Sequence, residues 1–267
     1  MTARAPRATR PSVTQAAFVL HSYDWSETSL ILDLFTREGG RVAVAAKGAK
    51  RPHSQLRPVL LPFQRLNVSL GRPPVGEEAA EVQTLRQAEW AGGGPMLSGA
   101  ALFSGFYLNE LLMKLLARQD PHPSLFDAYA ATLPTLARGG DAEEAGLRAF
   151  ELRLLAALGV LPDLSQVTQT AQALHPERGH ALRPELGITT LPAGDDSGLA
   201  ADDLIHLQAA LLHGSQAALQ AACAATWPAL KPQLRSLLHY HLGSPQLRTR
   251  QVMLDVQRLA SNPSVDR

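Results

Sequence analysis

The amino-acid sequence predicts an α+β chain in which a five-stranded barrel of the OB type is followed by an α-helical domain. Five β-prone runs lie within about 75 residues and are joined by turns, which is typical of a small closed barrel. Gly92-Gly93-Gly94-Pro95 then breaks the chain, and the composition beyond it becomes rich in Leu and Ala. We therefore expect a barrel domain over residues 14–91 and a helical domain over 92–260.

The strand predictions depend on alternation and on turn chemistry. Leu30, Leu32 and Leu34 lie on one face of a strand, and Gly39-Gly40 supplies a tight hairpin turn after it. An antiparallel sandwich with the same number of strands stays an alternative. The expected strands cover residues 16–23, 28–36, 41–46, 59–70 and 79–88.

Amphipathic spacing predicts the helices. The first helix, 99–116, repeats apolar residues every three or four positions, and Asp141 with Glu144 is expected to cap a third helix that Gly159 and Pro162 end. Residues 163–200 are polar and rich in Pro and Gly, so we expect a loop-rich insertion that is held by packing alone or is partly mobile. A basic arm (1–13) and a tail (261–267) are expected to be disordered. The other expected helices cover 124–138, 147–158, 202–213, 216–225, 228–242 and 246–259.

Charge is distributed unevenly along the chain. Residues 1–72 contain 11 lysines and arginines against 4 acids, whereas the rest contains 14 against 20. Four of the basic residues, Lys47, Lys50, Arg51 and Arg57, lie on a stretch that Gly48, Pro52 and Pro58 keep from forming a helix. A cationic loop on a β scaffold suits a phosphate backbone, although the loop taken alone is slightly more typical of a solubilising surface.

Aromatic residues in the barrel region are candidate stacking platforms for nucleic-acid bases. Phe35 and Phe63 lie in apolar patterns and are expected in the core. Tyr23 and Trp25 lie beside a polar turn, and of these two Trp25 is the better surface candidate.

Motifs for catalysis and metal binding are missing from the sequence. It has neither a phosphate-binding G-x-x-x-x-G-K-[ST] loop nor G-x-G-x-x-G nor H-E-x-x-H. His175 and His180 lack accompanying ligands, and His239 and His241 fall on different sides of a helix. One cysteine, Cys223, fits a reducing compartment, and no apolar run approaches the ~20 residues that cross a bilayer. We expect a cytoplasmic, nucleoid-associated protein that is not an enzyme and needs no cofactor.

Seven co-linear stretches carry a resemblance to a known family: AFVLHSYDWSETSLILDLFT (17–36), GR (40–41), AKGAKR (46–51), LPF (61–63), LFSGFYLNELL (102–112), LRAFEL (147–152) and LRTR (247–250). They closely resemble the RecO family of bacterial DNA repair proteins. The resemblance implies an N-terminal OB barrel, binding of single- and double-stranded DNA, and annealing of complementary strands. It also implies binding to RecR and to the acidic C-terminal tail of single-strand binding protein, which helps to load RecA. Many family members carry a four-cysteine zinc site after the third helix, and this chain resembles the branch without it.

Two groups of candidate site residues follow. The tail of the partner protein needs an apolar groove beside a cation; its candidates are Phe106, Leu112, Arg148, Phe150, Arg153 and Leu154, with Arg148 the leading one. An RNA-binding OB protein and a protein scaffold whose loop only adds solubility stay as alternatives. The candidates for phosphate contacts are Arg41, Lys47, Lys50, Arg51, Arg57, Arg65, Arg72, Arg248 and Arg250.

Overall fold

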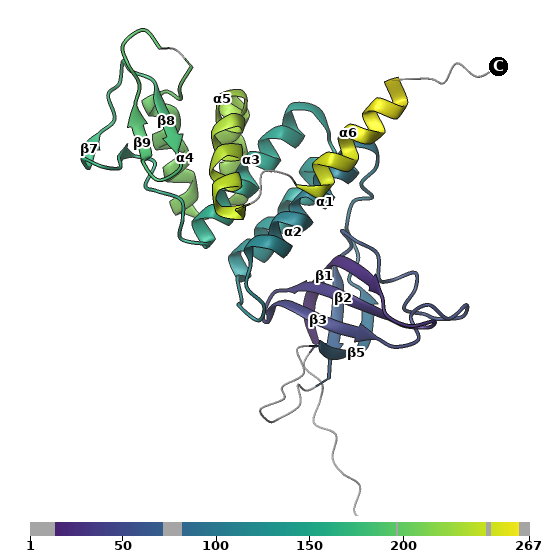
Figure 1. Cartoon of the computed structure of the whole chain (residues 1–267). Helices are drawn as coiled ribbons and strands as arrows, with labels where there is room; N and C mark the ends of the chain where they lie inside the picture. The colour runs from purple at the N-terminus through teal and green to yellow at the C-terminus, as the bar shows by residue number, and fades with distance from the viewer. Residues whose placement is uncertain (1–13, 72–81, 196, 244–246, 262–267) are drawn as a thin grey trace, which may run out of the picture.

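Five strands close into a barrel at one end of the chain, which confirms the OB-type prediction (Figure 1). The computed structural model describes residues 14–71, 82–195, 197–243 and 247–261. Around the barrel the strand order is β1-β2-β3-β5-β4, with β3 and β5 parallel and the other pairs antiparallel. The strands are β1 (Thr14–Asp24), β2 (Leu30–Thr36), β3 (Gly40–Ala46), β4 (Leu66–Leu70) and β5 (Val82–Trp90).

The barrel strands bury both of their faces where they meet the helices. Ala17 and Val19 of β1 point into the barrel with Leu34 of β2, whereas Phe18 and Phe35 point outward into the helical core. This follows from the period of two in a strand, which sends successive side chains to opposite faces. A single strand therefore contributes side chains to both the barrel core and the helical core.

Six helices form the rest of the described core, and two details correct the sequence predictions. Helix α3 begins at Gly140 after a Gly139 N-cap, with Asp141 in its first turn and no capping side chain. The two helices expected over 216–242 are one helix, α5, that contains Pro228 and Pro232. Each proline removes a backbone hydrogen bond, but the apolar side of α5 is buried along α3, and tertiary packing overrides local propensity. The helices are α1 (Gly99–Leu115), α2 (Pro123–Leu136), α3 (Gly140–Ala157), α4 (Ala201–His213), α5 (Gln216–Leu242) and α6 (Arg248–Ser261).

The expected loop-rich insertion contains two small hairpins, and its buried residues join the core of the helical domain. Leu182, Ile188 and Leu199 are buried in it, and the Leu182 N–H donates to Gln233 Oε1 of α5 at 2.6 Å. Packing therefore holds this segment against the helices. The strands are β6 (Gln166–Val167), β7 (Gln172–Ala173), β8 (His180–Arg183) and β9 (Gly187–Thr190).

The barrel and the helical domain share one hydrophobic core. The Phe18 ring packs on Phe126 and Tyr129 of α2, with centroids 5.2 and 5.0 Å away. Asn109 of α1 donates from Nδ2 to the Leu20 carbonyl at 2.9 Å and accepts from the Tyr129 hydroxyl at 2.6 Å. This buried network fixes the orientation of the two domains.

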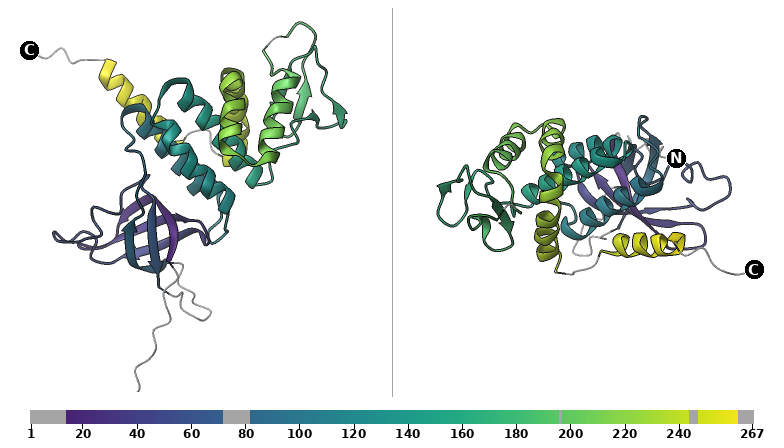
Figure 2. Two further views of the ribbon diagram at one scale, coloured as in Figure 1. Left: turned by 180° about the vertical axis from the view of Figure 1, so that it is seen from behind. Right: turned by 90° about the horizontal axis from the view of Figure 1, so that it is seen from above.

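Figures 1 and 2 show the resulting arrangement: the barrel lies at one end and the β6–β9 segment at the opposite end of the helical domain. Helix α6 lies beside α1 and contacts it more than any other element.

Candidate nucleic-acid interface

The basic loop, residues 47–58, is anchored to the barrel by its backbone. Ala49 is buried in the barrel core, and the Lys50 N–H donates to the Thr28 carbonyl at 3.0 Å. The Gly48 N–H donates to Ser29 Oγ at 3.3 Å. Gly48 has a φ of 73°, a conformation that glycine adopts without strain. The backbone of the basic loop is therefore ordered, and its side chains project from fixed positions.

Three cations of the basic loop, Lys47, Arg51 and Arg57, are exposed. Within the described part of the chain, none of their side chains forms a hydrogen bond or ion pair. Lys50 differs, because its Nζ lies 2.9 Å from Asp24 Oδ1 and donates to the Ser26 carbonyl at 3.1 Å. The loop thus has three uncompensated charges, while Lys50 helps to hold the neighbouring turn.

Arg41, predicted to contact DNA, lies instead between the barrel and the helices. Its side chain is 14% exposed, it donates to the Met113 carbonyl of α1, and its Nε lies 4.0 Å from Asp33 Oδ1. The Gln119 N–H donates to the Arg41 carbonyl at 2.9 Å. Arg41 is occupied in holding the two domains together, so this prediction is corrected.

The remaining DNA candidates fall at three places. Arg65 is exposed just before β4, and Arg72 lies outside the described residues. Arg248 and Arg250 are both exposed on the first turn of α6. Arg248 lines a hollow of about 470 Å³ that it shares with Tyr23 of β1, whereas Arg250 lines a different pocket. The structure brings Arg248 toward the barrel and separates it from Arg250.

Glu110 of α1 fixes the start of α6. Its carboxylate accepts hydrogen bonds from the backbone N–H groups of Arg248 and Thr249 at 2.8 and 2.9 Å. Burial raises the pKa of Glu110, but these backbone hydrogen bonds outweigh it and hold the pKa below its ordinary value. A carboxylate at a helix N-terminus also complements the helix dipole. Glu110 therefore sets where the two arginines of α6 stand.

The groove expected for a partner tail does not form from the predicted apolar residues. Leu112, Phe150 and Leu154 are 0% exposed, because α1 and α3 are packed by other elements on both sides. Phe106 is half-exposed and packs on the Phe63 ring at 5.0 Å. Arg153 donates to the Leu211 carbonyl at the end of α4. Leu112, Phe150 and Leu154 thus belong to the core and Arg153 to a helix contact, which corrects the prediction for them, whereas Phe106 lines the hollow of about 470 Å³.

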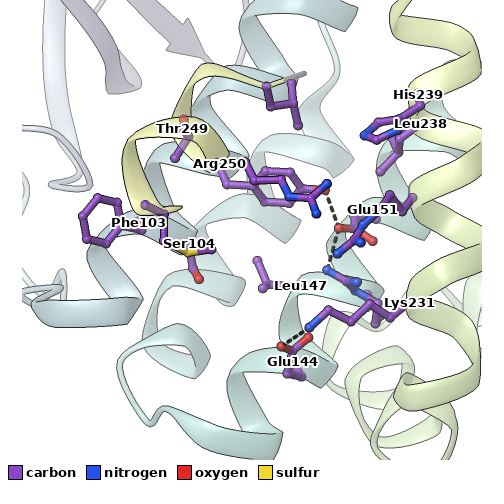
Figure 3. A pocket seen from close by; sticks show the side chains of 15 residues that line it. Phe103, Ser104, Glu144, Leu147, Glu151, Lys231, Leu238, His239, Thr249 and Arg250 are labelled. Carbon is purple, nitrogen blue, oxygen red and sulfur yellow. Dashed lines mark hydrogen bonds and ion pairs between the residues drawn. The ribbon is translucent and has the colours of Figure 1, made fainter. Parts of the chain in front are cut away.

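A pocket of about 190 Å³ nevertheless lies between α1, α3, α5 and α6 (Figure 3). Arg148 is one of its lining residues. We call it the helical pocket. Phe103, Leu147 and Leu238 give it apolar walls. Its charged lining residues are Arg148, Lys231, Arg235, Arg250, Glu144 and Glu151.

A buried ion pair lies on one wall of the helical pocket. Arg148, 5% exposed, donates to Glu151 Oε1 at 2.7 Å, and the Tyr107 hydroxyl donates to the same oxygen at 2.6 Å. Burial raises the pKa of Glu151 above its ordinary value, although Arg148 and the Tyr107 hydroxyl oppose this. Lys231 pairs with Glu144 at 2.5 Å. Each acid of the pocket thus has its own cation.

Two cations of the helical pocket are then left for a ligand. Arg235 of α5 and Arg250 of α6 are exposed and form no ion pair within the described residues. The Arg250 side chain extends from α6 toward Glu151 (Figure 3). The pocket therefore combines apolar walls with a net positive charge, which suits an anion attached to an apolar group.

Sequence reasoning missed Lys231 and Arg235 as pocket residues. Both lie in the helix expected over 228–242, but the pocket forms only where that helix packs beside α1, α3 and α6. The helical period of one segment gives no information about which other helices lie beside it. Trp90, exposed at the end of β5, was also missed.

No group of three or more His, Cys, Asp or Glu that could hold a metal ion occurs among the residues the structure describes. Cys223 is a buried free thiol, and burial raises its pKa to about 12. Within the same residues, none of the helices has the length and apolar character that would let it cross a membrane.

Comparison with known proteins identifies the family. Residues 11–93 match the family model described as recombination protein O N terminal, and residues 96–251 match recombination protein O C terminal. DNA repair protein RecO of Verminephrobacter eiseniae (strain EF01-2) is 52% identical over 247 residues, which cover 92% of this chain and 96% of that protein. RecO of Polaromonas naphthalenivorans (strain CJ2) is 52% identical, with coverages of 92% and 97%. The chain therefore belongs to the RecO family of DNA repair proteins.

Proposed function

We propose that this chain is a non-enzymatic recombination mediator that binds single- and double-stranded DNA and anneals complementary strands. One observation carries the proposal: the basic loop holds Lys47, Arg51 and Arg57 exposed and uncompensated on an OB barrel. Phosphate contacts of this kind are independent of sequence, as a mediator that acts at any break requires.

Annealing follows from the same charges. Two strands repel each other through their phosphates, and a cationic surface that holds both backbones reduces this repulsion. The basic loop contacts the backbones and leaves the base edges free to pair. The protein then needs no bond-making step of its own.

Salt dependence tests this proposal. Four single-strand contacts, from Lys47, Arg51, Arg57 and Arg65, should give a slope of log K against log salt of about −3. Fluorescence anisotropy of a labelled single strand between 50 and 200 mM salt measures it. A flat dependence would contradict the proposal, and stronger competition by RNA than by DNA of equal length would favour an RNA-binding function instead.

We also propose that the helical pocket binds the acidic C-terminal tail of single-strand binding protein. A tail of several aspartates that ends in an aromatic residue needs an apolar wall beside cations. Phe103 and Leu238 offer the wall, and Arg235 and Arg250 offer the charges. Engagement of RecR, and through it the loading of RecA, belongs to the same proposed role.

Replacing Arg250 with Ala should weaken binding of an acidic, aromatic-ended peptide by about 10–100-fold, the value of a hydrogen bond to a charged group. Arg248→Ala is the matched control, because Arg248 lies two residues away on the same helix but lines the other hollow. Titration calorimetry with the peptide measures both. Equal losses in the two variants would place the tail outside the helical pocket.

A further inference from the structure

A third hollow, lined mainly by apolar residues, opens where the chain leaves the barrel for the helices. It has a volume of about 680 Å³ and is lined by residues of the 58–64 segment, the end of β5 and the start of the helical domain. Three large apolar side chains that line it are exposed to solvent: Leu61 by 50%, Trp90 by 61% and Met96 by 89%. We call it the Trp90 hollow. Such a gathering of exposed apolar side chains in one concave place marks an interaction site more often than chance exposure.

The Trp90 indole is held at its edge. Trp90 Nε1 donates to Gln64 Oε1 at 3.3 Å, and Gln64 Nε2 donates in turn to the Pro95 carbonyl at 3.3 Å. The ring is therefore oriented by a hydrogen-bonded chain while most of its surface stays exposed. A flat aromatic that is fixed in advance loses little entropy when another ring stacks on it.

The floor of the Trp90 hollow is rigid. Phe63, which also lines it, is buried with a φ of 65°, a left-handed conformation that non-glycine residues adopt rarely. Gly105 of α1 makes room for it, since a Cβ at that position would lie 2.8 Å from Phe63 Cε1. Strained backbone held by tight packing is a recurrent feature of binding sites. The hollow is thus already formed without a ligand.

The Trp90 hollow is continuous with the basic loop. Pro58, the last residue of that loop, and Val59 after it form part of the wall of the hollow, and the uncompensated Arg57 directly precedes Pro58. Glu89 precedes Trp90 in β5, so its side chain points to the opposite face of the strand. On that face its neighbour on β4 is the exposed Asn67. A polyanion that follows the loop cations would therefore meet apolar surface and not an acid.

We propose that the Trp90 hollow is a base-stacking subsite for single-stranded nucleic acid, an inference that rests on the proposed DNA-binding function and extends it. The loop cations hold the backbone, and an unpaired base leaves the strand at Arg57 to stack on the indole. Stacking accepts any base because every base has a π-face, which keeps the subsite independent of sequence. Bases within a duplex are already stacked on both sides, so this subsite selects single strands.

Intrinsic fluorescence tests whether a base reaches Trp90. In the full-length protein with Trp25→Phe and Trp227→Phe, Trp90 is the only remaining tryptophan. Adding an oligo(dT) single strand should quench its emission in proportion to the bound fraction measured separately by anisotropy. Binding by anisotropy without quenching would overturn the stacking proposal and leave the DNA-binding function intact. Absence of binding by both methods would overturn the two together.

Substitution measures what the subsite contributes. Trp90→Ala should weaken oligo(dT) binding roughly tenfold, as expected for one stacked base at about 1.4 kcal/mol, and leave duplex binding unchanged. Trp90→Phe should restore most of the affinity because it keeps an aromatic face. Tyr240→Ala removes another exposed aromatic side chain, on α5, and should change neither. An equal loss for single strands and duplex, or no loss at all, would contradict the subsite and favour a protein partner for the hollow.

Discussion

Reversing Arg51 and Arg57 to glutamate is expected to weaken single-stranded DNA binding at least 25-fold at about 0.1 M salt and to abolish strand annealing. Each single-strand phosphate contact contributes a slope of about −0.7, or roughly fivefold at that salt concentration, and reversal adds repulsion to the loss. The slope of log K against log salt should fall by about 1.4. Anisotropy titrations and a complementary-strand annealing assay measure the two effects.

The change should not affect folding, because both side chains are exposed and form no bond within the described residues. Lys50 is left alone because it pairs with Asp24 and holds the adjacent turn. A double variant with Arg138→Glu and Arg183→Glu alters the net charge equally at exposed sites on the helical domain. If both double variants lose affinity to the same extent, overall charge and not the basic loop governs binding.

The sequence predicts the barrel well because its signals are local. Leu32 and Leu34 alternate with outward-facing residues, and Gly39-Gly40 turns the chain between β2 and β3 as expected. The positions of Phe35 and Phe63 in the core are confirmed as well. The alternation of apolar residues along one strand identifies the face that will be buried, and no knowledge of the elements that cover this face is needed.

The candidate site was harder to predict because it depends on which faces pack together. Arg41 follows a hairpin turn, a position where the sequence alone predicts an exposed cation. Only the packing of α1 against the barrel shows that the side chain is mostly covered and donates to the Met113 carbonyl. Phe150 and Leu154 satisfy the pattern of a groove as well as that of a core. Amphipathic spacing shows that a helix has an apolar face, but not whether a neighbour covers that face.

The pocket found in place of the expected groove depends on a buried charge pair with a large expected effect on stability. Glu151 is 1% exposed, so its charge is tolerated only because Arg148 donates at 2.7 Å and Tyr107 at 2.6 Å. Removing one partner of such a pair typically costs about 3–5 kcal/mol, because the other charge is left uncompensated. We therefore expect Arg148→Met to lower the free energy of unfolding by about that amount near pH 8. Lys231→Met is the control, since its pair with Glu144 is partly exposed and is worth about 1 kcal/mol or less.

The destabilisation by Arg148→Met should shrink as the pH falls. The pKa of Glu151 is raised in the folded state, so the folded protein binds more protons than the unfolded chain between the two pKa values, and stability is lost as the pH rises through that window. Losing Arg148 removes an interaction that lowers this pKa, so the window extends to higher pH. Urea unfolding at pH 5 and pH 8 measures the difference. Adding Glu151→Gln to Arg148→Met should recover most of the stability at pH 8, because no buried charge remains to be paired; a double variant as unstable as the single one would show that Arg148 acts through packing alone.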